Sequence, residues 1–474
     1  MLVIISDLHL GDGTTAASIP ASAFYLFAKR LRQDAHFASM RYGKYRPIEE
    51  LDVLLMGDIL DPIHSTRWFY PLNDETMQTM TKPGDAEYIR PWSDPNDPKY
   101  APKLLEVTRA TLKENERSLE VLRKLASGEF IEFDAPSQNG ERDASAAKIP
   151  LKVRLHYMVG NHDWYYHLKG EAFDAIRREI IDAMGLSNSP SPFPHDLRKF
   201  KSDFPWQADN APEIQKLFDE YRVFARHGDM YDSFNFDREK GRDFATLGDV
   251  LAMEVINKYP ETLKRMAGSD NVIVDNLRQI TNVRPALATP LWISGQIKTL
   301  AMQNKLNELS EQELKEVWDT LADEFLELDF VRKADKSFQL DVVDKLQAAI
   351  KVSKLISFET LDKLILRLQR GKRASKDQSF AQYALQEPAF LDKSARYIVY
   401  GHTHHHETIP LDYNNIDGNQ IYFNSGTWHT YFDLARKDPT EKKFVPYKAL
   451  TYITFYKDHE HDERNFETWS GAYA

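Results

Sequence analysis

The chain contains no cysteine. This absence excludes disulfides, thiolate metal ligands, iron–sulfur clusters and cysteine nucleophiles. Any metal ion must therefore be held by oxygen and imidazole. Both donor types are plentiful, because the chain has 15 histidines and 72 aspartates and glutamates.

Long apolar runs and a basic N-terminal segment are also absent. The longest weakly polar stretch, residues 286–297, contains Pro290 and Gly295 and is shorter than the roughly 20 residues that span a bilayer. The opening MLVIISDLHL has no basic region and no small-residue cleavage site, so it predicts a strand rather than a signal peptide. We expect no transmembrane segment and a cytoplasmic protein.

A positive charge balance is lacking too, since the formal net charge is −11. The chain therefore has no general attraction to nucleic acid, although a local basic patch can still supply one. The main basic cluster more simply marks a solvated helix end, because cations favour helix C-termini. It consists of Arg367, Arg370, Lys372, Arg373 and Lys376.

The length and composition allow a large folded core. The 474 residues exceed the roughly 100–200 of one domain, which predicts two structural units or one heavily decorated domain. Hydrophobic residues make up 42% of the chain and charged residues 28%, as in ordinary globular proteins. We expect a folded chain rather than a disordered one.

Short apolar runs, each broken by a polar cluster, organise the chain. Runs of this length that are rich in Val, Ile and Tyr predict buried strands. They lie at residues 2–5, 53–56, 155–159, 221–225 and 397–400, and SDLH, GDILD, GNHD, RHGD and GHTH follow them. The clusters thus fall at the carboxyl ends of five expected strands, where α/β sheets bind ligands.

The segments between these runs predict a layered α/β fold. Residues 21–35 have helical spacing and are long enough for a crossover helix. Two later runs, residues 421–423 and 449–456, are expected to complete the sheet. Smaller insertions are expected at residues 70–126 and 164–220, and an exposed loop at residues 134–147.

Residues 236–393 change to helical periodicity. Ser310 and Glu313 have the spacing of a capping box, and Leu309 and Leu314 that of a hydrophobic staple, before an apolar stripe. A second helix is expected to end near Arg370. We therefore expect a catalytic core in two parts, residues 1–235 and 394–474, separated by a mainly helical insertion or cap at residues 236–393.

The five clusters together resemble the calcineurin-like metallophosphoesterase family. Its pattern is DxH, GDxxD, GNH followed by D or E, a later histidine before glycine, and GHxH. All five blocks match, over residues 1 to about 235 and about 395 to 430. The SDLHLG opening looks more like the bacterial members. The resemblance implies a metallophosphoesterase β-sheet core with flanking helices, and it does not cover the helical insertion.

The resemblance also implies a ligand set for two divalent metal ions. One ion would be held by Asp7, His9, Asp58 and His404. The other would be held by Asp58, Asn161, His227 and His402, so that Asp58 bridges the pair. A shared carboxylate offsets the repulsion between two close cations. Such mixed ligands suit manganese, iron or zinc.

Two further residues would act on the substrate by this resemblance. His162 would protonate the leaving alkoxide or stabilise charge on the phosphate, which imidazole can do near neutral pH. Asp61 would orient His162, as carboxylates orient catalytic imidazoles elsewhere. The alternative for Asp61 is a turn cap.

Several neighbours have weaker functional expectations. Asp163, Asp229 and Asp232 are either acceptors that tune the ligand histidines or ordinary loop carboxylates. Asn424 and Gly426 resemble a supporting loop of the family, and His429 is a minor candidate for substrate contact. His405 and His406 are expected to be exposed or supporting, while core packing is favoured for Trp164, Tyr165 and Tyr166.

The expected activity is hydrolysis of a phosphodiester or pyrophosphate bond in a phosphorylated small molecule or nucleotide-linked substrate. The insertion would select the substrate without contributing ligands. Pro62 follows Asp61 where protein phosphatases of the superfamily have arginine, so a protein phosphatase is disfavoured. UDP-2,3-diacylglucosamine pyrophosphatases share the opening but lack so long an insertion. A nuclease of the same superfamily and a non-catalytic scaffold remain alternatives.

Overall fold

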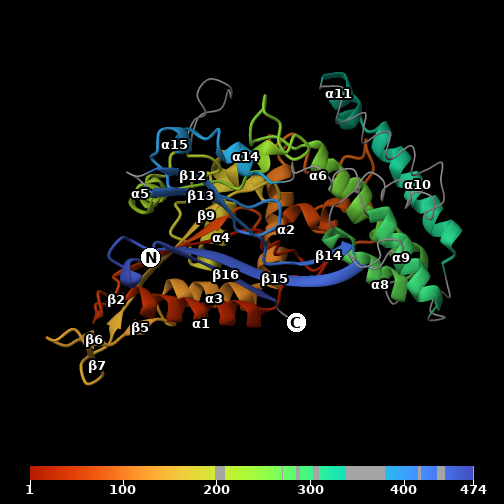
Figure 1. Cartoon of the computed structure of the whole chain (residues 1–474). Coiled ribbons are helices and arrows are strands. Elements are labelled where there is room, and N and C mark those ends of the chain that lie inside the picture. The colour runs from red at the N-terminus through yellow and green to blue at the C-terminus, as the bar shows by residue number, and fades with distance from the viewer. Residues whose placement is uncertain are drawn as a thin grey trace.

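The computed structural model describes residues 1–197, 209–268, 271–283, 289–302, 309–337, 379–414, 418–434 and 444–472. It is a mixed α/β structure with two main sheets (Figure 1). The expected basic cluster and the expected helix end near Arg370 lie outside the described residues.

The first sheet has six strands in the order β14-β15-β1-β4-β9, with β16 also paired to β15. The strands β1, β4 and β9 are parallel, and β15 runs antiparallel to β1. Their bounds are β1 Leu2–Ile5, β4 Glu50–Met56, β9 Lys152–Met158, β14 Thr430–Leu434, β15 Phe444–Phe455 and β16 Phe466–Ala472.

The second sheet has four strands in the order β10-β11-β13-β12. Here β10, β11 and β13 are parallel, and β12 is antiparallel to β13. The bounds are β10 Val223–Ala225, β11 Tyr397–Tyr400, β12 Glu407–Asn414 and β13 Gly418–Asn424. Small two-stranded ribbons are formed by β2 Met40–Arg41, β3 Lys44–Tyr45, β5 Glu132–Phe133, β6 Ala135–Pro136, β7 Arg142–Asp143 and β8 Ile149–Pro150.

All seven apolar runs form strands as predicted, but they do not form one sheet. Strand β1 pairs with β4 on one edge and β15 on the other, so neither edge is left for β11. The strands β10, β11 and β13 therefore pair with one another. The expected exposed loop at residues 134–147 carries the short ribbon β6–β7.

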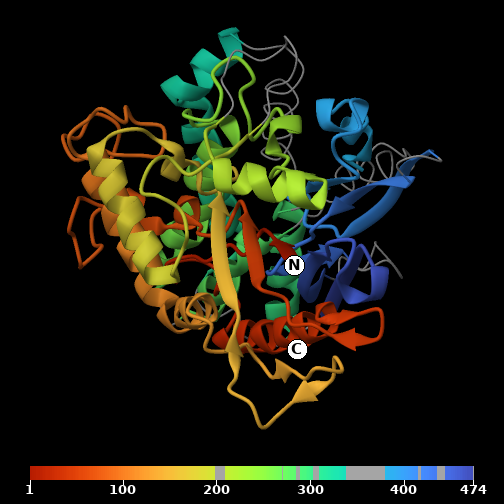
Figure 2. The same cartoon turned by 90° about the vertical axis from the view of Figure 1, so that its left-hand side faces the viewer.

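Alternate side chains of the first sheet point to opposite faces, so the sheet packs against the second sheet on one face and against helices on the other. Leu2 and Ile4 point into a core shared with the second sheet, whereas Val3 and Ile5 point into a core shared with helices. The helices on that second face are α1 Ala21–Ala38, α2 Tyr100–Glu114, α3 Glu116–Ala126 and α4 Glu171–Met184. Figure 2 shows the orange and yellow helices on one side of the central strands and the blue strands on the other.

Helix α5 (Pro212–Tyr221) covers the second sheet together with α14 (Ala381–Ala384) and α15 (Pro388–Leu391). Ala384, Ala389 and Phe390 belong to the same hydrophobic cluster as the strands of the second sheet, although they lie within the range expected to form the insertion. The division of the chain into three parts stays a prediction.

Most of the described helical segment forms a hydrophobic cluster of its own, running from Val250 to Val331. Its elements are α6 Leu247–Leu251, the π-helical turn η5 Ala252–Asn257, α7 Lys258–Ala267, α8 Val272–Leu277, the 3-10 turn η6 Arg278–Asn282, α9 Thr289–Met302, α10 Glu311–Glu327 and α11 Asp329–Ser337. Helix α10 begins at the predicted capping box of Ser310 and Glu313. In Figure 1 helices α8 to α10 stand together at the right of the sheets.

Within the described ranges, the longest and most apolar helices still fall short of what is needed to cross a membrane.

Candidate metal centre

The five polar clusters of the sequence meet at the carboxyl ends of β1, β4, β9, β10 and β11. Three of these strands belong to the first sheet and two to the second. All seven expected ligands and both expected catalytic residues lie in this one region, linked by the contacts described below. The site therefore depends on both sheets being in place.

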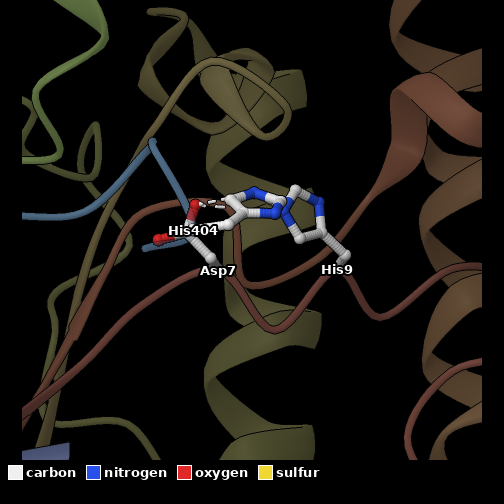
Figure 3. Close-up of side chains that lie close together, drawn as sticks. All are labelled: Asp7, His9 and His404. Atoms are coloured by element: carbon white, nitrogen blue, oxygen red, sulfur yellow. Dashed lines mark hydrogen bonds and ion pairs between the residues drawn. The ribbon is translucent and has the colours of Figure 1, made fainter. Parts of the chain in front are cut away.

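One group of ligand atoms is formed by Asp7, His9 and His404 (Figure 3). The Nε2 atoms of His9 and His404 lie 3.0 Å apart. Asp7 Oδ1 lies 3.2 Å from His404 Nε2 and 3.9 Å from His9 Nε2. Asp58 Oδ2 lies 4.0 Å from His9 Nε2 and completes the predicted set.

A second group surrounds the other side of Asp58. Asp58 Oδ2 lies 3.2 Å from His227 Nε2. Asn161 Oδ1 lies 3.2 Å from the same nitrogen and 2.9 Å from His402 Nδ1. Asp58 is thus the carboxylate common to both groups, as predicted for a bridge.

The outward nitrogen of three of the expected ligand histidines has an acceptor that fixes its proton. His9 Nδ1 donates to Asp61 Oδ2 at 3.1 Å, and His227 Nδ1 donates to the carbonyl of Met56 at 3.1 Å. His402 Nε2 donates to Asp232 Oδ2 at 3.2 Å. In neutral imidazole the inward nitrogen then carries a lone pair.

These inward lone pairs face other acceptors, namely carboxylate and amide oxygens and a second imidazole. Acceptors packed against acceptors repel one another unless a proton or a metal ion lies between them. Outward hydrogen bonds that fix the inward nitrogen are also the usual support of metal-bound histidine. The donor set therefore fits divalent metal ions.

Strained backbone conformations occur at most of the expected ligands. Five of the seven expected ligands have positive φ angles between 47° and 66°, although none is glycine: these are Asp7, His9, Asp58, His402 and His404. Such conformations cost free energy and persist where the surrounding structure enforces them, commonly at functional sites. The sharp turns let side chains at strand ends point back to one centre.

Three glycines leave room for the ligands. A Cβ atom on Gly57 would lie 2.6 Å from His227 Nδ1, and one on Gly160 would lie 2.8 Å from His227 Nε2. A Cβ on Gly401 would lie 2.6 Å from Asp7 Oδ2. Each position precedes an expected ligand in the chain, so the glycine in GD, GN and GH has a steric reason.

The charges of the site stabilise one another. Burial favours a raised pKa for Asp58, but His227 and His162 outweigh it and hold that pKa well below its usual range. Burial would lower the pKa of His227, but Asp58 and Asp7 outweigh it and raise that pKa to about 10. The carboxylates of Asp58 and Asp7 thus stabilise a positive charge beside them. Without metal this charge is the proton on His227, and a bound metal ion would replace that proton.

His162 and Asp61 lie together, as expected. Asp61 Oδ1 accepts a hydrogen bond from His162 Nδ1 at 3.0 Å, and its other oxygen accepts from His9. Asp61 also caps the 3-10 turn η1 (Pro62–His64) through the His64 amide at 3.3 Å. The carboxylate therefore caps the turn and also binds His162, and its expected orienting role in catalysis stays a prediction.

Of the three carboxylates expected to tune ligand histidines, Asp232 alone contacts one directly. Asp163 accepts from the amides of Ile59 and Gly160 and from the Tyr157 hydroxyl, which holds two ligand loops together. Burial raises the pKa of Asp163 to about 7. Asp229 pairs with Arg242 and His195.

The remaining candidates support the site or the core. Asn424 Nδ2 donates to the Gly401 carbonyl at 2.7 Å, and Gly426 has a φ of 72°. His405 is exposed, and His406 bonds to the Asn424 carbonyl at 3.1 Å. The aromatic residues that follow the acid candidate are buried in the core, as favoured: Trp164, Tyr165 and Tyr166.

Sequence reasoning missed His64 and its partner Asn257. The His64 ring lies 5.1 Å from that of His162 and lines a small cleft with His9, Asp61 and His429. Burial lowers the pKa of His64 to about 4. Its position three residues after Asp61 is the only sequence signal, whereas nothing local marks Asn257 within the helical segment.

The helical segment reaches the site at a second asparagine. His429 Nε2 donates to Asn282 Oδ1 at 2.6 Å, and the His429 ring lies 5.3 Å from that of His9. The minor candidate His429 thus lines the cleft beside the centre.

A comparison of the chain with models of protein families gives no match, and a comparison with curated proteins finds no similar sequence.

Proposed function

We propose that this protein is a two-metal phosphoesterase of the calcineurin-like type. It hydrolyses a phosphodiester or pyrophosphate bond in a small-molecule or nucleotide-linked substrate. The observation that carries the proposal is the convergence of inward nitrogen and oxygen acceptors on Asp58. This arrangement extends over two groups that share one carboxylate, as a pair of cations requires.

Asp7, His9, Asp58 and His404 would hold one ion, and Asp58, Asn161, His227 and His402 the other. Manganese, iron and zinc all accept such ligands. Two bound cations supply an activated water and neutralise charge on the phosphoryl oxygens during in-line displacement.

The chain's own contribution to the reaction is centred on His162. With Nδ1–H bonded to Asp61, the other ring nitrogen is Nε2, which lies 3.9 Å from Asp58 Oδ2 and so faces the centre. A protonated Nε2 can give its proton to the leaving oxygen of the ester. The Asp61 carboxylate stabilises the charged ring and fixes its orientation.

The test combines metal analysis with hydrolysis. The protein is loaded with manganese, iron or zinc, and its activity is measured on bis-p-nitrophenyl phosphate, p-nitrophenyl phosphate and single-stranded DNA. We expect two metal ions per chain and hydrolysis of at least one nitrophenyl ester. Faster cleavage of single-stranded DNA than of either nitrophenyl ester would favour the nuclease alternative.

Asp58→Asn should lose both metal and activity, because both groups share this carboxylate. Asp182→Asn, on the exposed face of α4, is the matched control and should change neither. A metal-loaded wild-type protein that hydrolyses none of the substrates would favour the scaffold alternative and overturn the proposal.

A further inference from the structure

Asn257 connects the helical segment to the turn that follows Asp61. It is fully buried and is the last residue of the π-helical turn η5. Its Nδ2 donates to the Ile63 carbonyl at 2.9 Å, and its Oδ1 accepts from His64 Nδ1 at 2.8 Å. One side chain thus holds two consecutive residues of η1.

These two bonds require an amide at this position. The Ile63 carbonyl needs a donor, which fixes the orientation of the Asn257 amide and turns its oxygen toward His64. Neither Asp nor Ala can satisfy both groups. In a buried place each partner left unsatisfied lowers the stability of the fold.

The 3-10 turn η1, which Asn257 holds, also binds the side chain of Asp61. The His64 amide donates to Asp61 Oδ1, the same oxygen that accepts from His162 Nδ1. A shift of the turn would therefore move this carboxylate relative to the His162 ring. The chain of contacts runs from Asn257 through the turn and Asp61 to His162.

The π-helical geometry of η5 is consistent with a functional role for Asn257. Helix α6 and helix α7 flank it, so the π-helical turn interrupts an otherwise α-helical stretch. Single π-helical turns inside α-helices are rare and frequent at functional sites. Here the turn brings a polar side chain into contact with η1 across a sequence separation of 193 residues.

We propose that Asn257 is a positioning residue for the acid step: it clamps the Pro62–His64 turn, which sets Asp61 and thereby His162. This inference rests on the proposed function for its kinetic meaning. It also changes the expected role of residues 236–393, because the segment then contributes to chemistry as well as to substrate choice.

The kinetic test uses a series of aryl phosphodiesters whose leaving groups range from nitrophenol to phenol. In Asn257→Ala, kcat/KM should fall about 10- to 100-fold on the poorest leaving group, as is usual for residues that orient catalytic groups. It should fall much less on nitrophenyl esters, which leave without a proton. Adding the same change to His162→Ala should have no further effect on the leaving-group dependence.

Asn282→Ala is the matched control. Asn282 is also a buried asparagine of the helical segment that binds a cleft histidine, but its partner is His429 rather than the η1 turn. An equal fall for all leaving groups in Asn257→Ala, or the same pattern in Asn282→Ala, would overturn the inference.

A second readout does not depend on activity. In the metal-free protein, the His162 Nδ1 proton bonded to Asp61 should give a downfield NMR resonance, assigned by its loss in His162→Ala. Asn257→Ala should shift or broaden it, and Asn282→Ala should leave it unchanged. An unchanged resonance in Asn257→Ala would refute the positioning role.

This readout also separates the two proposals. A wild-type protein without hydrolase activity refutes the proposed function, while the resonance still decides the positioning. If Asn257→Ala does not fold, Asn257→Asp keeps the size of the side chain and removes the donor to the Ile63 carbonyl, and the same outcomes apply.

Discussion

The carboxylate of Asp61 accepts a hydrogen bond from Nδ1 of His162 at 3.0 Å. This contact fixes the orientation of the His162 ring. Nδ1 is turned toward Asp61, and Nε2 lies 3.9 Å from Asp58 Oδ2, on the side of the proposed metal centre. The same carboxylate binds His9 at 3.1 Å. The proposed acid and a proposed metal ligand therefore share one orienting group.

Replacing His162 by alanine should slow the reaction without removing metal. As a general acid His162 is worth roughly 10² to 10⁴ in rate, and most where the leaving group needs a proton. His162→Ala should keep two metal ions. Its rate of hydrolysis should fall steeply on alkyl phosphate esters and less on nitrophenyl esters. Metal loss, or an equal fall on both esters, would show that another residue is the acid.

Asp61→Asn should weaken both metal binding and the acid function of His162, because an amide cannot accept well from two imidazoles at once. We expect about 10- to 100-fold weaker metal binding, the usual cost of removing a group that orients a ligand. The leaving-group dependence should steepen as in His162→Ala. Titration with metal, followed by kinetics at saturating metal, measures the two effects separately; unchanged metal affinity would contradict the His9 contact.

Gly160→Ala should remove metal binding through sterics alone. The added Cβ would overlap Asp58 Oδ1 and lie 2.8 Å from His227 Nε2, so at least one ligand must move. Gly11→Ala is the control in the same region, because a Cβ there meets nothing within 4 Å. Elemental analysis should show metal loss in the first variant only. Full metal content in Gly160→Ala would contradict the ligand geometry.

His167 predicts a pH dependence of stability outside the site. Its ring lies between Asp209 and Asp243, at 2.9 and 2.6 Å. Burial works to lower the pKa of His167, but the two carboxylates outweigh it and raise the pKa to about 9. The protonated ring therefore stabilises the fold fully below the unfolded pKa of about 6.5, and this stability is lost as pH rises through about 9.

The contribution of His167 is up to about 3 kcal/mol at low pH, since each unit of pKa shift corresponds to about 1.4 kcal/mol. Urea unfolding between pH 6 and 10 should show this slope in the wild type and a reduced slope in His167→Gln. The exposed His459→Gln is the control and should keep it. Equal slopes in all three proteins would contradict the ion pairs.

Much of the core could be predicted because its signals are local. A strand shows itself as a short apolar run, and the polar residues that end it must lie at its carboxyl end. The start of α10 was predicted from the capping box of Ser310 and Glu313 together with the hydrophobic staple and the apolar stripe, which are all local signals. The division into two sheets was not predicted, because it depends on β15 taking the free edge of β1.

The sequence by itself determined which donor atoms are available and that they occur at strand ends. Without cysteine only oxygen and imidazole remain, and the spacing of Asp7, His9 and Asp58 within their clusters is fixed by the chain. The tertiary structure decided which nitrogen of each histidine faces inward, through partners such as Met56 and Asp232. It also decided the contact of Asn257 with His64, because hydrogen bonds between residues 193 positions apart leave no local pattern to read.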